Sequence, residues 1–160
     1  MEKVNVTLPD GKIVEVEKST SALDLVKSIS MKLYKEAVAC KINGILKDLW
    51  TPIDEDCSFE VVTFASDEGK RVYWHTTSHI LAQAVKRLFE DKVKLGIGPA
   101  IDNGFYYDFD VEESITMEIL EKIEEEMQKI IKEDLKIERF ELSREEAIKL
   151  MQQRGENYKV

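Results

Sequence analysis

Residues 4–16 read VNVTLPDGKIVEV, and this stretch decides how the first part of the chain folds. Apolar and polar side chains alternate on both sides of Pro9-Asp10-Gly11, as they do in strands with one buried face. Pro-Asp-Gly favours a turn because proline presets one turn dihedral and glycine tolerates a positive φ. The stretch therefore predicts a β-hairpin.

The following residues supply the other pieces of a small domain. Ser21 and Asp24 have the spacing of a capping box, and apolar residues follow at helical spacing to Leu33. Asn43-Gly44 predicts a second hairpin between 37–42 and 45–49, and 59–64 predicts a last strand. This order is typical of a β-grasp, ubiquitin-like domain, although an ordinary α+β sandwich fits the same periodicity.

The polar stretch 66–70 predicts a boundary between a first domain, 1–65, and a second domain, 66–160. In the second domain we expect a helix from Tyr73 or Trp74 to about Phe89, a loop-and-strand region over 96–110, and a helix over 116–134. A strand over 136–142 and a helix capped by Ser143 should follow, so the fold class is α+β throughout. The long helix has apolar residues at core spacing: Met117, Leu120, Ile123, Met127, Ile130 and Ile131.

Composition limits the function classes. The chain has 160 residues and a net charge of −9, so its overall field would repel nucleic acid. Any contact with tRNA or DNA must be local or supplied by another part of a larger protein. No window approaches a membrane span and the first residues lack a signal-peptide core, which makes the cytoplasm the default location. In that compartment Cys40 and Cys57 are expected to be buried thiols rather than a disulfide.

The only two histidines are His75 and His79, four residues apart in HTTSH. Residues at this spacing share one helix face, so both imidazoles can serve one site. On a helical wheel Leu81, Ala84, Val85 and Leu88 share the core face, and His75, His79, Ala82 and Lys86 lie roughly opposite. The pair supplies only two of the three or four ligands that zinc needs, so it is at most a partial metal site. We therefore expect no stoichiometric zinc. Two other interpretations of the pair remain: the histidines are exposed and have no role, or they line a cleft that orders substrate or water.

Three further features concern the same domain. Gly96-Ile97-Gly98-Pro99 is too short for a dinucleotide fingerprint and predicts a turn or a close backbone approach. Tyr106 and Tyr107 alternate in direction, so one should be buried and the other exposed. From the residues alone, Lys159 is an ordinary surface lysine.

The order of these motifs resembles one known family. A β-grasp domain, then HTTSHILAQAVKRLF, GIGPAIDNGFYYDFD and SREEAIKLMQQRGENYKV, is similar to the N-terminal region of the threonyl-tRNA synthetases. The resemblance covers essentially the whole chain and implies a TGS domain over 1–65 and an incomplete, truncated α+β editing domain over 66–160. The NGFYYD stretch is its most discriminating part.

The resemblance also implies site residues. In this family the second domain hydrolyses seryl-tRNA, because a site that accepts threonine rejects serine by only about 1–3 kcal/mol. It implies that His75 and His79 line the editing site, with Tyr107 nearby. His75 would bind the terminal ribose or position water, and Lys159 would orient water or stabilise developing charge.

The same resemblance implies the wider protein. The parent would be an aminoacyl-tRNA synthetase that ligates threonine to its tRNA with ATP. Its partners would be tRNA, threonine and ATP, and it would have no membrane partner. It would form a homodimer through domains absent here. ATP, Mg and Zn belong to the missing catalytic domain, and no cofactor is expected in these residues. The family's CxxxH segment is also absent, so we expect little or no deacylation by this chain. A TGS-type module that binds RNA or protein, or a trans-acting deacylase, is the alternative.

Overall fold

A computed structural model describes residues 2–112 and 114–159. Its contacts divide the chain into two compact units, residues 1–73 and residues 74–160. The predicted domain ranges, 1–65 and 66–160, remain predictions; their end residues Met1 and Val160 lie outside the described part of the chain. Within the described residues no helix is long and apolar enough to cross a membrane.

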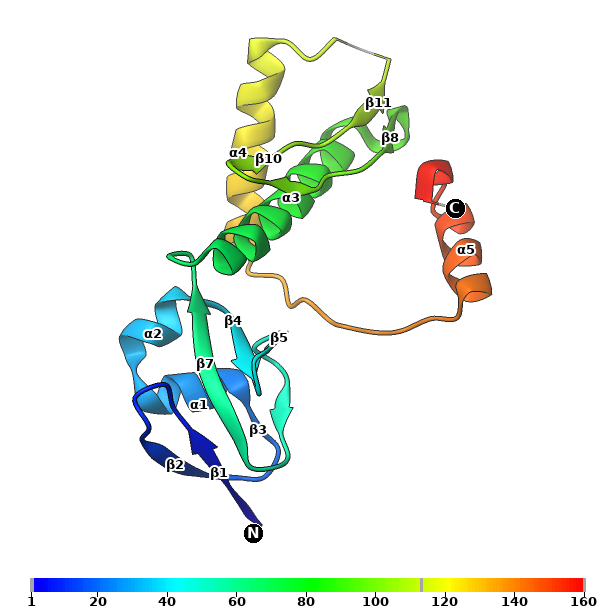
Figure 1. Ribbon diagram of the computed structural model, residues 1–160. Helices are drawn as coiled ribbons and strands as arrows, with labels where there is room; N and C mark the ends of the chain where they lie inside the picture. The colour runs from blue at the N-terminus through cyan, green and yellow to red at the C-terminus, as the bar shows by residue number, and fades with distance from the viewer. Residues whose placement is uncertain (1, 113, 160) are drawn as a thin grey trace. The chain divides into compact units, whose positions relative to one another are not determined.

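The first unit is built on a five-stranded mixed sheet (Figure 1). Strands β1 (Lys3–Thr7) and β2 (Ile13–Glu17) form the predicted antiparallel hairpin, with Val4 opposite Val16 and Val6 opposite Val14. The order is β2-β1-β7-β4-β5, in which β7 (Cys57–Thr63) runs parallel to β1 and antiparallel to β4 (Ala37–Ile42). Strand β5 (Ile45–Lys47) lies at the edge, and β3 (Thr20–Ser21) pairs with β6 (Pro52–Ile53). This is the predicted β-grasp arrangement.

The predicted helical run after Ser21 is divided into two helices. Ser21 caps α1 (Ala22–Ile29) by accepting a hydrogen bond from Asp24 N, as its spacing predicts. Ser30 then ends α1 in an extended conformation and caps α2 (Met31–Glu36) with its own hydroxyl. The side chains of α1 and the sheet share one core, whose buried members are Val4, Val6, Ala22, Leu25, Val26, Cys40, Ile53, Cys57 and Phe59.

Two local predictions in this unit are confirmed. Asn43 and Gly44 both have positive φ, 52° and 76°, the conformation that a tight two-residue hairpin turn requires. Cys40 and Cys57 are both buried free thiols. Burial raises the pKa of the Cys40 thiol to about 11, so this side chain behaves as a small apolar core residue.

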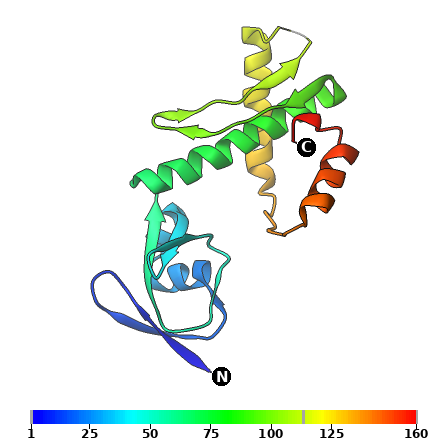
Figure 2. The same ribbon diagram turned by 45° about the vertical axis from the view of Figure 1, so that its right-hand side comes forward.

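The second unit contains most of α3 (Asp67–Phe89), which begins several residues before its predicted start. The short helix η1 (Glu90–Lys92) leads into β8 (Val93–Leu95), which pairs with β11 (Phe109–Val111). Between them β9 (Ala100–Ile101) and β10 (Gly104–Phe105) form a small hairpin. Helix α4 (Met117–Glu133), helix α5 (Arg144–Gln153) and the 3-10 turn η2 (Asn157–Lys159) complete the unit, and Figures 1 and 2 show α4 crossing α3.

The core of this unit lies where α3, α4 and the β8–β11 pair meet. Its buried residues are Ala84, Val85, Val93, Ile123 and Ile130. The predicted core stripe of α4 is wrong at Met117, Leu120 and Ile131, which are exposed, and it missed Ile119, which packs against the core. The reason is that α4 packs along a single narrow stripe, so only one flank of its apolar surface is covered.

The predicted wheel for α3 is right in part. Ala84 and Val85 are buried as expected, and both histidines are exposed. However, Leu88 is exposed and Ala82 is buried. Ala82 lines a cavity together with side chains from distant segments, so both faces of this helix are in contact with protein near the histidines.

The predicted strand over 136–142 is wrong. Residues 135–142 contain no strand and are exposed throughout, including Ile137 and Phe140 at 72% and 66%. Figure 1 shows the segment as an extended loop that joins α4 to α5. Its apolar residues suit a strand, but the segment joins none of the sheets of the described chain.

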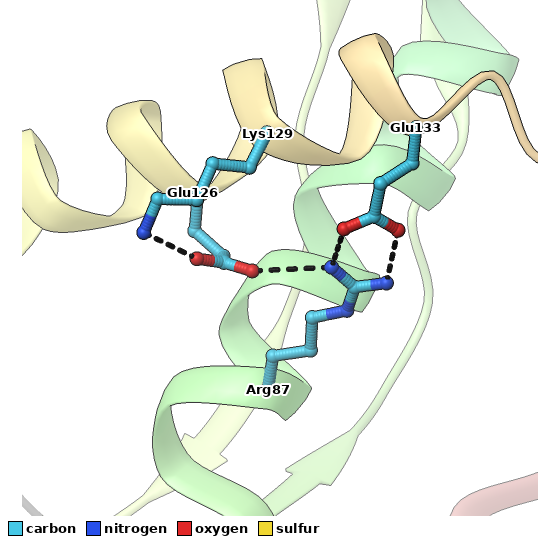
Figure 3. A network of polar contacts seen from close by, with 4 residues as sticks. All are labelled: Arg87, Glu126, Lys129 and Glu133. Atoms are coloured by element: carbon cyan, nitrogen blue, oxygen red, sulfur yellow. Dashed lines mark hydrogen bonds and ion pairs between the residues drawn. The ribbon is translucent and has the colours of Figure 1, made fainter.

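Polar contacts hold α4 against α3. Arg87 donates two hydrogen bonds to the Glu133 carboxylate, both 2.7 Å, and a third to Glu126 at 3.2 Å, while Lys129 donates to Glu126 (Figure 3). The two parallel bonds to Glu133 use the planar fork of the guanidinium, which makes the contact directional. These bonds hold the core stripe of α4 in place on α3.

Candidate functional site

The two histidines of α3 face each other. Their Nε2 atoms are 3.0 Å apart and their rings are nearly perpendicular, at 85°. At this distance one nitrogen must donate the hydrogen and the other must accept it, so the geometry does not fit two imidazolium rings. The pair can therefore hold a proton between its rings or move one to a bound group.

Three effects act together on His79. Partial burial of the ring is the largest, and the nearby His75 and Lys159 charges add to it; together they lower the pKa of His79. All three disfavour the positively charged ring. A neutral imidazole can accept a proton, so His79 has the electrostatic environment of a base.

The serine between the histidines anchors a loop beneath them. Ser78 is fully buried, and its hydroxyl lies 2.7 Å from the His75 carbonyl and 2.9 Å from the Gly98 carbonyl, both of which can accept its hydrogen. Gly98 in turn lies against the Tyr107 ring, where a Cβ atom would come within 2.0 Å of a ring carbon. The sequence prediction of a close backbone approach at Gly96-x-Gly98 is confirmed at Gly98, and glycine is required there.

Tyr107 and Lys159 meet across a long sequence interval. Tyr107 stacks on Phe109, with ring centroids 4.8 Å apart. The Lys159 ammonium lies 3.3 Å from the Tyr107 hydroxyl, to which it donates, and 5.7 Å from the ring centroid. Tyr106 is exposed, as predicted for one of the two tyrosines, whereas Tyr107 is only half-buried rather than a core residue.

His79, Tyr107 and Lys159 line one cavity of about 790 Å³. His75 reaches it only through its contact with His79 and is not among the lining residues. The other lining residues come from α3, β8, α5 and the turn before η2: Ala82, Gln83, Lys86, Arg87, Leu95, Met151, Arg154 and Glu156. The structure thus brings three of the four predicted site residues to one cavity and the fourth into contact with them.

The cavity is cationic although the chain is acidic. Lys86, Arg87, Arg154 and Lys159 line it, against the single carboxylate of Glu156. Two of these cations form ion pairs, Arg87 with carboxylates of α4 and Lys86 with Glu156. No carboxylate of the described chain forms an ion pair with Lys159 or Arg154. A ligand carrying negative charge suits this lining.

The site contains few metal-binding groups. His75 and His79 supply two nitrogen ligands, and among residues 2–112 and 114–159 no group of three or more His, Cys, Asp or Glu side chains is placed to hold an ion. The expectation that the pair is at most a partial metal site stays a prediction.

Two residues of this region, Ser78 and Glu156, were not predicted from the sequence. Ser78 lies three residues before Leu81 and seven before Val85, so a small polar residue at a core position could have signalled a buried hydrogen bond. Glu156 binds Lys86, 70 positions away, with 2.8 Å between nitrogen and oxygen. No spacing rule connects residues so far apart.

Comparison with known proteins agrees with this architecture. The family model described as TGS domain matches residues 4–63, so the chain contains a TGS domain followed by a second α+β unit. Over 157 residues it is 59% identical to the threonine–tRNA ligase of Clostridium tetani, covering 98% of this chain and 24% of that protein. The corresponding enzyme of Caldanaerobacter subterraneus is 61% identical over 155 residues, covering 97% and 24%. The chain is homologous to the N-terminal region of threonyl-tRNA synthetases and spans about a quarter of their length.

Proposed function

We propose that this chain is the N-terminal region of a threonine–tRNA ligase and that its second unit contributes to the hydrolytic removal of serine from mischarged tRNA. One observation carries the proposal: His79, Tyr107 and Lys159, which are far apart in sequence, line one cationic cavity. The homology to threonine–tRNA ligases supports it independently. The ligase activity, with ATP, threonine and tRNA as substrates in the cytoplasm, belongs to the whole protein.

The chemistry follows from the side chains. Water attacks the ester carbonyl carbon, the bond to the ribose oxygen breaks, and a proton passes from water to that oxygen. His79, whose pKa is lowered, is placed to accept or relay this proton with His75. Lys159 supplies a positive charge for the developing oxyanion, and Tyr107 orients it through their 3.3 Å contact.

The cavity lining also suits the substrate class. Arg154 and Lys159 offer positive charge to the phosphates near the acceptor end of a tRNA. The apolar surfaces of Ala82, Leu95 and Met151 suit a nucleoside. We propose that this chain binds the aminoacylated end but deacylates it slowly, because the family's CxxxH segment does not occur in its 160 residues.

The test uses an analogue of the aminoacylated end in which an amide replaces the ester, 3′-serylamino-3′-deoxyadenosine. Added to the 160-residue chain, it should shift the NMR signals of His79, Tyr107 and Lys159. Lys159→Met should weaken binding, whereas Lys149→Met, which removes an exposed lysine of α5 that does not line the cavity, should not.

Two results would contradict the proposal. If the analogue shifts only residues outside the cavity, the editing role is wrong and a TGS-type binding module becomes the better description. Rapid deacylation of seryl-tRNA by the purified chain would contradict the expected low activity and favour a trans-acting deacylase.

A further inference from the structure

Glu156 is the only charged side chain among the buried residues of the described chain, with 7% of its surface exposed. It lies between α5 and η2, three residues before Lys159. Charged side chains are rarely buried unless they are paired. Its burial therefore indicates a specific structural contact rather than a solvated surface position.

Both carboxylate oxygens of Glu156 are used. Lys86 Nζ, from α3, lies 2.8 Å from Oε1, and the Leu95 backbone N–H, from β8, donates to Oε2 over 3.3 Å. Burial by itself would raise the pKa of this carboxyl, but Lys86 and the Leu95 N–H more than offset it, and the net shift is downward. The carboxylate is thus held charged between two elements of the second unit.

The backbone of Glu156 connects this anchor to Lys159. Lys159 N–H donates to the Glu156 carbonyl over 3.0 Å, which closes the turn η2. The Lys159 side chain leaves that turn and ends 3.3 Å from the Tyr107 hydroxyl. The position of the Lys159 backbone is therefore set by where Glu156 is held.

A second contact of the same turn is weaker. Tyr158 donates to Asp110 over 2.8 Å, but Tyr158 is 62% exposed. Both contacts end on a carboxylate, but water competes for both partners of the exposed Tyr158 bond, so it contributes less to position than the buried contacts of Glu156. Glu156 is consequently the principal anchor of η2.

We propose that Glu156 is a positioning residue, whose buried carboxylate holds η2 on α3 and β8 and thereby places the Lys159 ammonium beside Tyr107 in the cavity. The placement stands on the geometry alone. Its relevance to ester hydrolysis rests on the function proposed above.

The experiment measures the pKa of His79 by NMR titration in Glu156→Gln and in Lys159→Met. The Lys159 charge contributes to lowering the pKa of His79, so Lys159→Met should raise that pKa. If Glu156→Gln releases η2 and moves Lys159 away, the pKa of His79 should rise in this variant too. The rise should be smaller than in Lys159→Met, because loss of the Glu156 charge acts in the opposite direction.

The sign of the shift separates the proposal from a direct charge effect. Removing the Glu156 charge deletes an anion near the cavity and leaves the Lys86 ammonium unpaired, and both changes alone would lower the pKa of His79. A rise therefore requires movement of Lys159. In a Lys159→Met background, Glu156→Gln should no longer raise the pKa, as expected of two residues that act through one contact.

Controls keep the test decisive. Ser143→Ala removes the cap of α5 without touching η2 and should leave the His79 titration unchanged. Glu156→Asp keeps the charge, but its side chain is one methylene too short to reach both partners. It should therefore raise the pKa of His79 partially, and it keeps the test possible even if Glu156→Gln fails to fold. An unchanged or lowered pKa in both Glu156 variants would overturn the proposal, as would a rise that persists without Lys159.

Failure of the serine analogue to bind while the pKa rise remains would refute the proposed function and leave the positioning role intact.

Discussion

The two units of this chain bury their apolar residues in different ways. In the first unit β1, β7, β4 and α1 enclose one core, and the large side chains of that core, such as Phe59 and Leu25, are inaccessible to water. In the second unit two-stranded pieces and crossing helices enclose a smaller core. Both units leave some large apolar side chains exposed, among them Ile13, Ile45 and Trp50 in the first and Met117, Ile137 and Phe140 in the second. A continuous sheet with a helix across it gathers residues from many segments into one core, whereas isolated strand pairs cover only the residues beneath them.

A substitution in the core of the first unit should have the strongest effect on stability. Phe59→Ala should cost about 3–5 kcal/mol of stability, because it leaves a cavity that the sheet cannot close. Hydrogen exchange resolved by residue should show loss of protection in residues 1–73 while that of 74–160 persists. Equal loss of protection in both units would show that they unfold together.

A smaller effect should be confined to the second unit. Arg87→Met removes the three hydrogen bonds that hold α4 on α3, and Arg87→Lys should restore only part of them because lysine lacks the planar fork. We expect a lower urea midpoint for unfolding of residues 74–160. An unchanged midpoint would mean that the apolar stripe of α4 alone holds the helix.

The same network predicts a pH dependence. Hydrogen bonding to Arg87 lowers the pKa of Glu133, and hydrogen bonding to Lys129 and Arg87 lowers the pKa of Glu126. Their contribution is present above the unfolded glutamate pKa, about 4.3, and is lost as the pH falls through the lower folded values. Between pH 7 and pH 3 the difference in urea midpoint between wild type and Arg87→Met should therefore shrink. A constant difference would contradict the assignment.

The cap of α5 should have a local effect of about 1 kcal/mol. Ser143 and Glu146 form a capping box, in which Ser143 Oγ accepts from Glu146 N over 3.3 Å and Glu146 accepts from Ser143 N over 3.0 Å. Ser143→Ala should speed hydrogen exchange in the first turn of α5. Glu145→Gln, at an exposed neighbouring position, should not, and a similar acceleration in both would argue for a charge effect instead.

The smallest effect is expected in the exposed segment. Ile137→Ser and Phe140→Ser should each change stability by no more than about 0.5 kcal/mol, because both side chains are already exposed to water. A larger loss in thermal unfolding would mean that the segment packs against a partner in solution, for example in a second copy of the chain. Sedimentation at two concentrations distinguishes these cases.

Local patterns predicted most of the first unit. Pro9-Asp10-Gly11, Ser21 and Asn43-Gly44 each act through contacts with close neighbours in sequence, so their conformations follow from local chemistry. The capping box that begins at Ser143 could be predicted in the same way. Ser30 was missed because apolar spacing continues across it, although its hydroxyl ends one helix and begins the next.

The candidate site was predicted in part for the same reason. The shared direction of His75 and His79 follows from helical spacing, and their exposure was confirmed. The contact of Lys159 with Tyr107 joins residues 52 positions apart. Before the family resemblance was considered, nothing in the residues distinguished Lys159 from a surface lysine.

Sequence patterns were enough to predict the turns, the helix caps, the β-grasp order of elements and the histidine face, because each depends on interactions within a few residues. The folded structure was needed to show that Leu88, Met117 and the 136–142 segment stay exposed, because burial depends on which distant surface covers a residue. It was also needed to show that Glu156 is buried against Lys86 and that Lys159 reaches Tyr107. A charge can be buried and a lysine oriented only when segments far apart in the chain are brought together, and that information is not local.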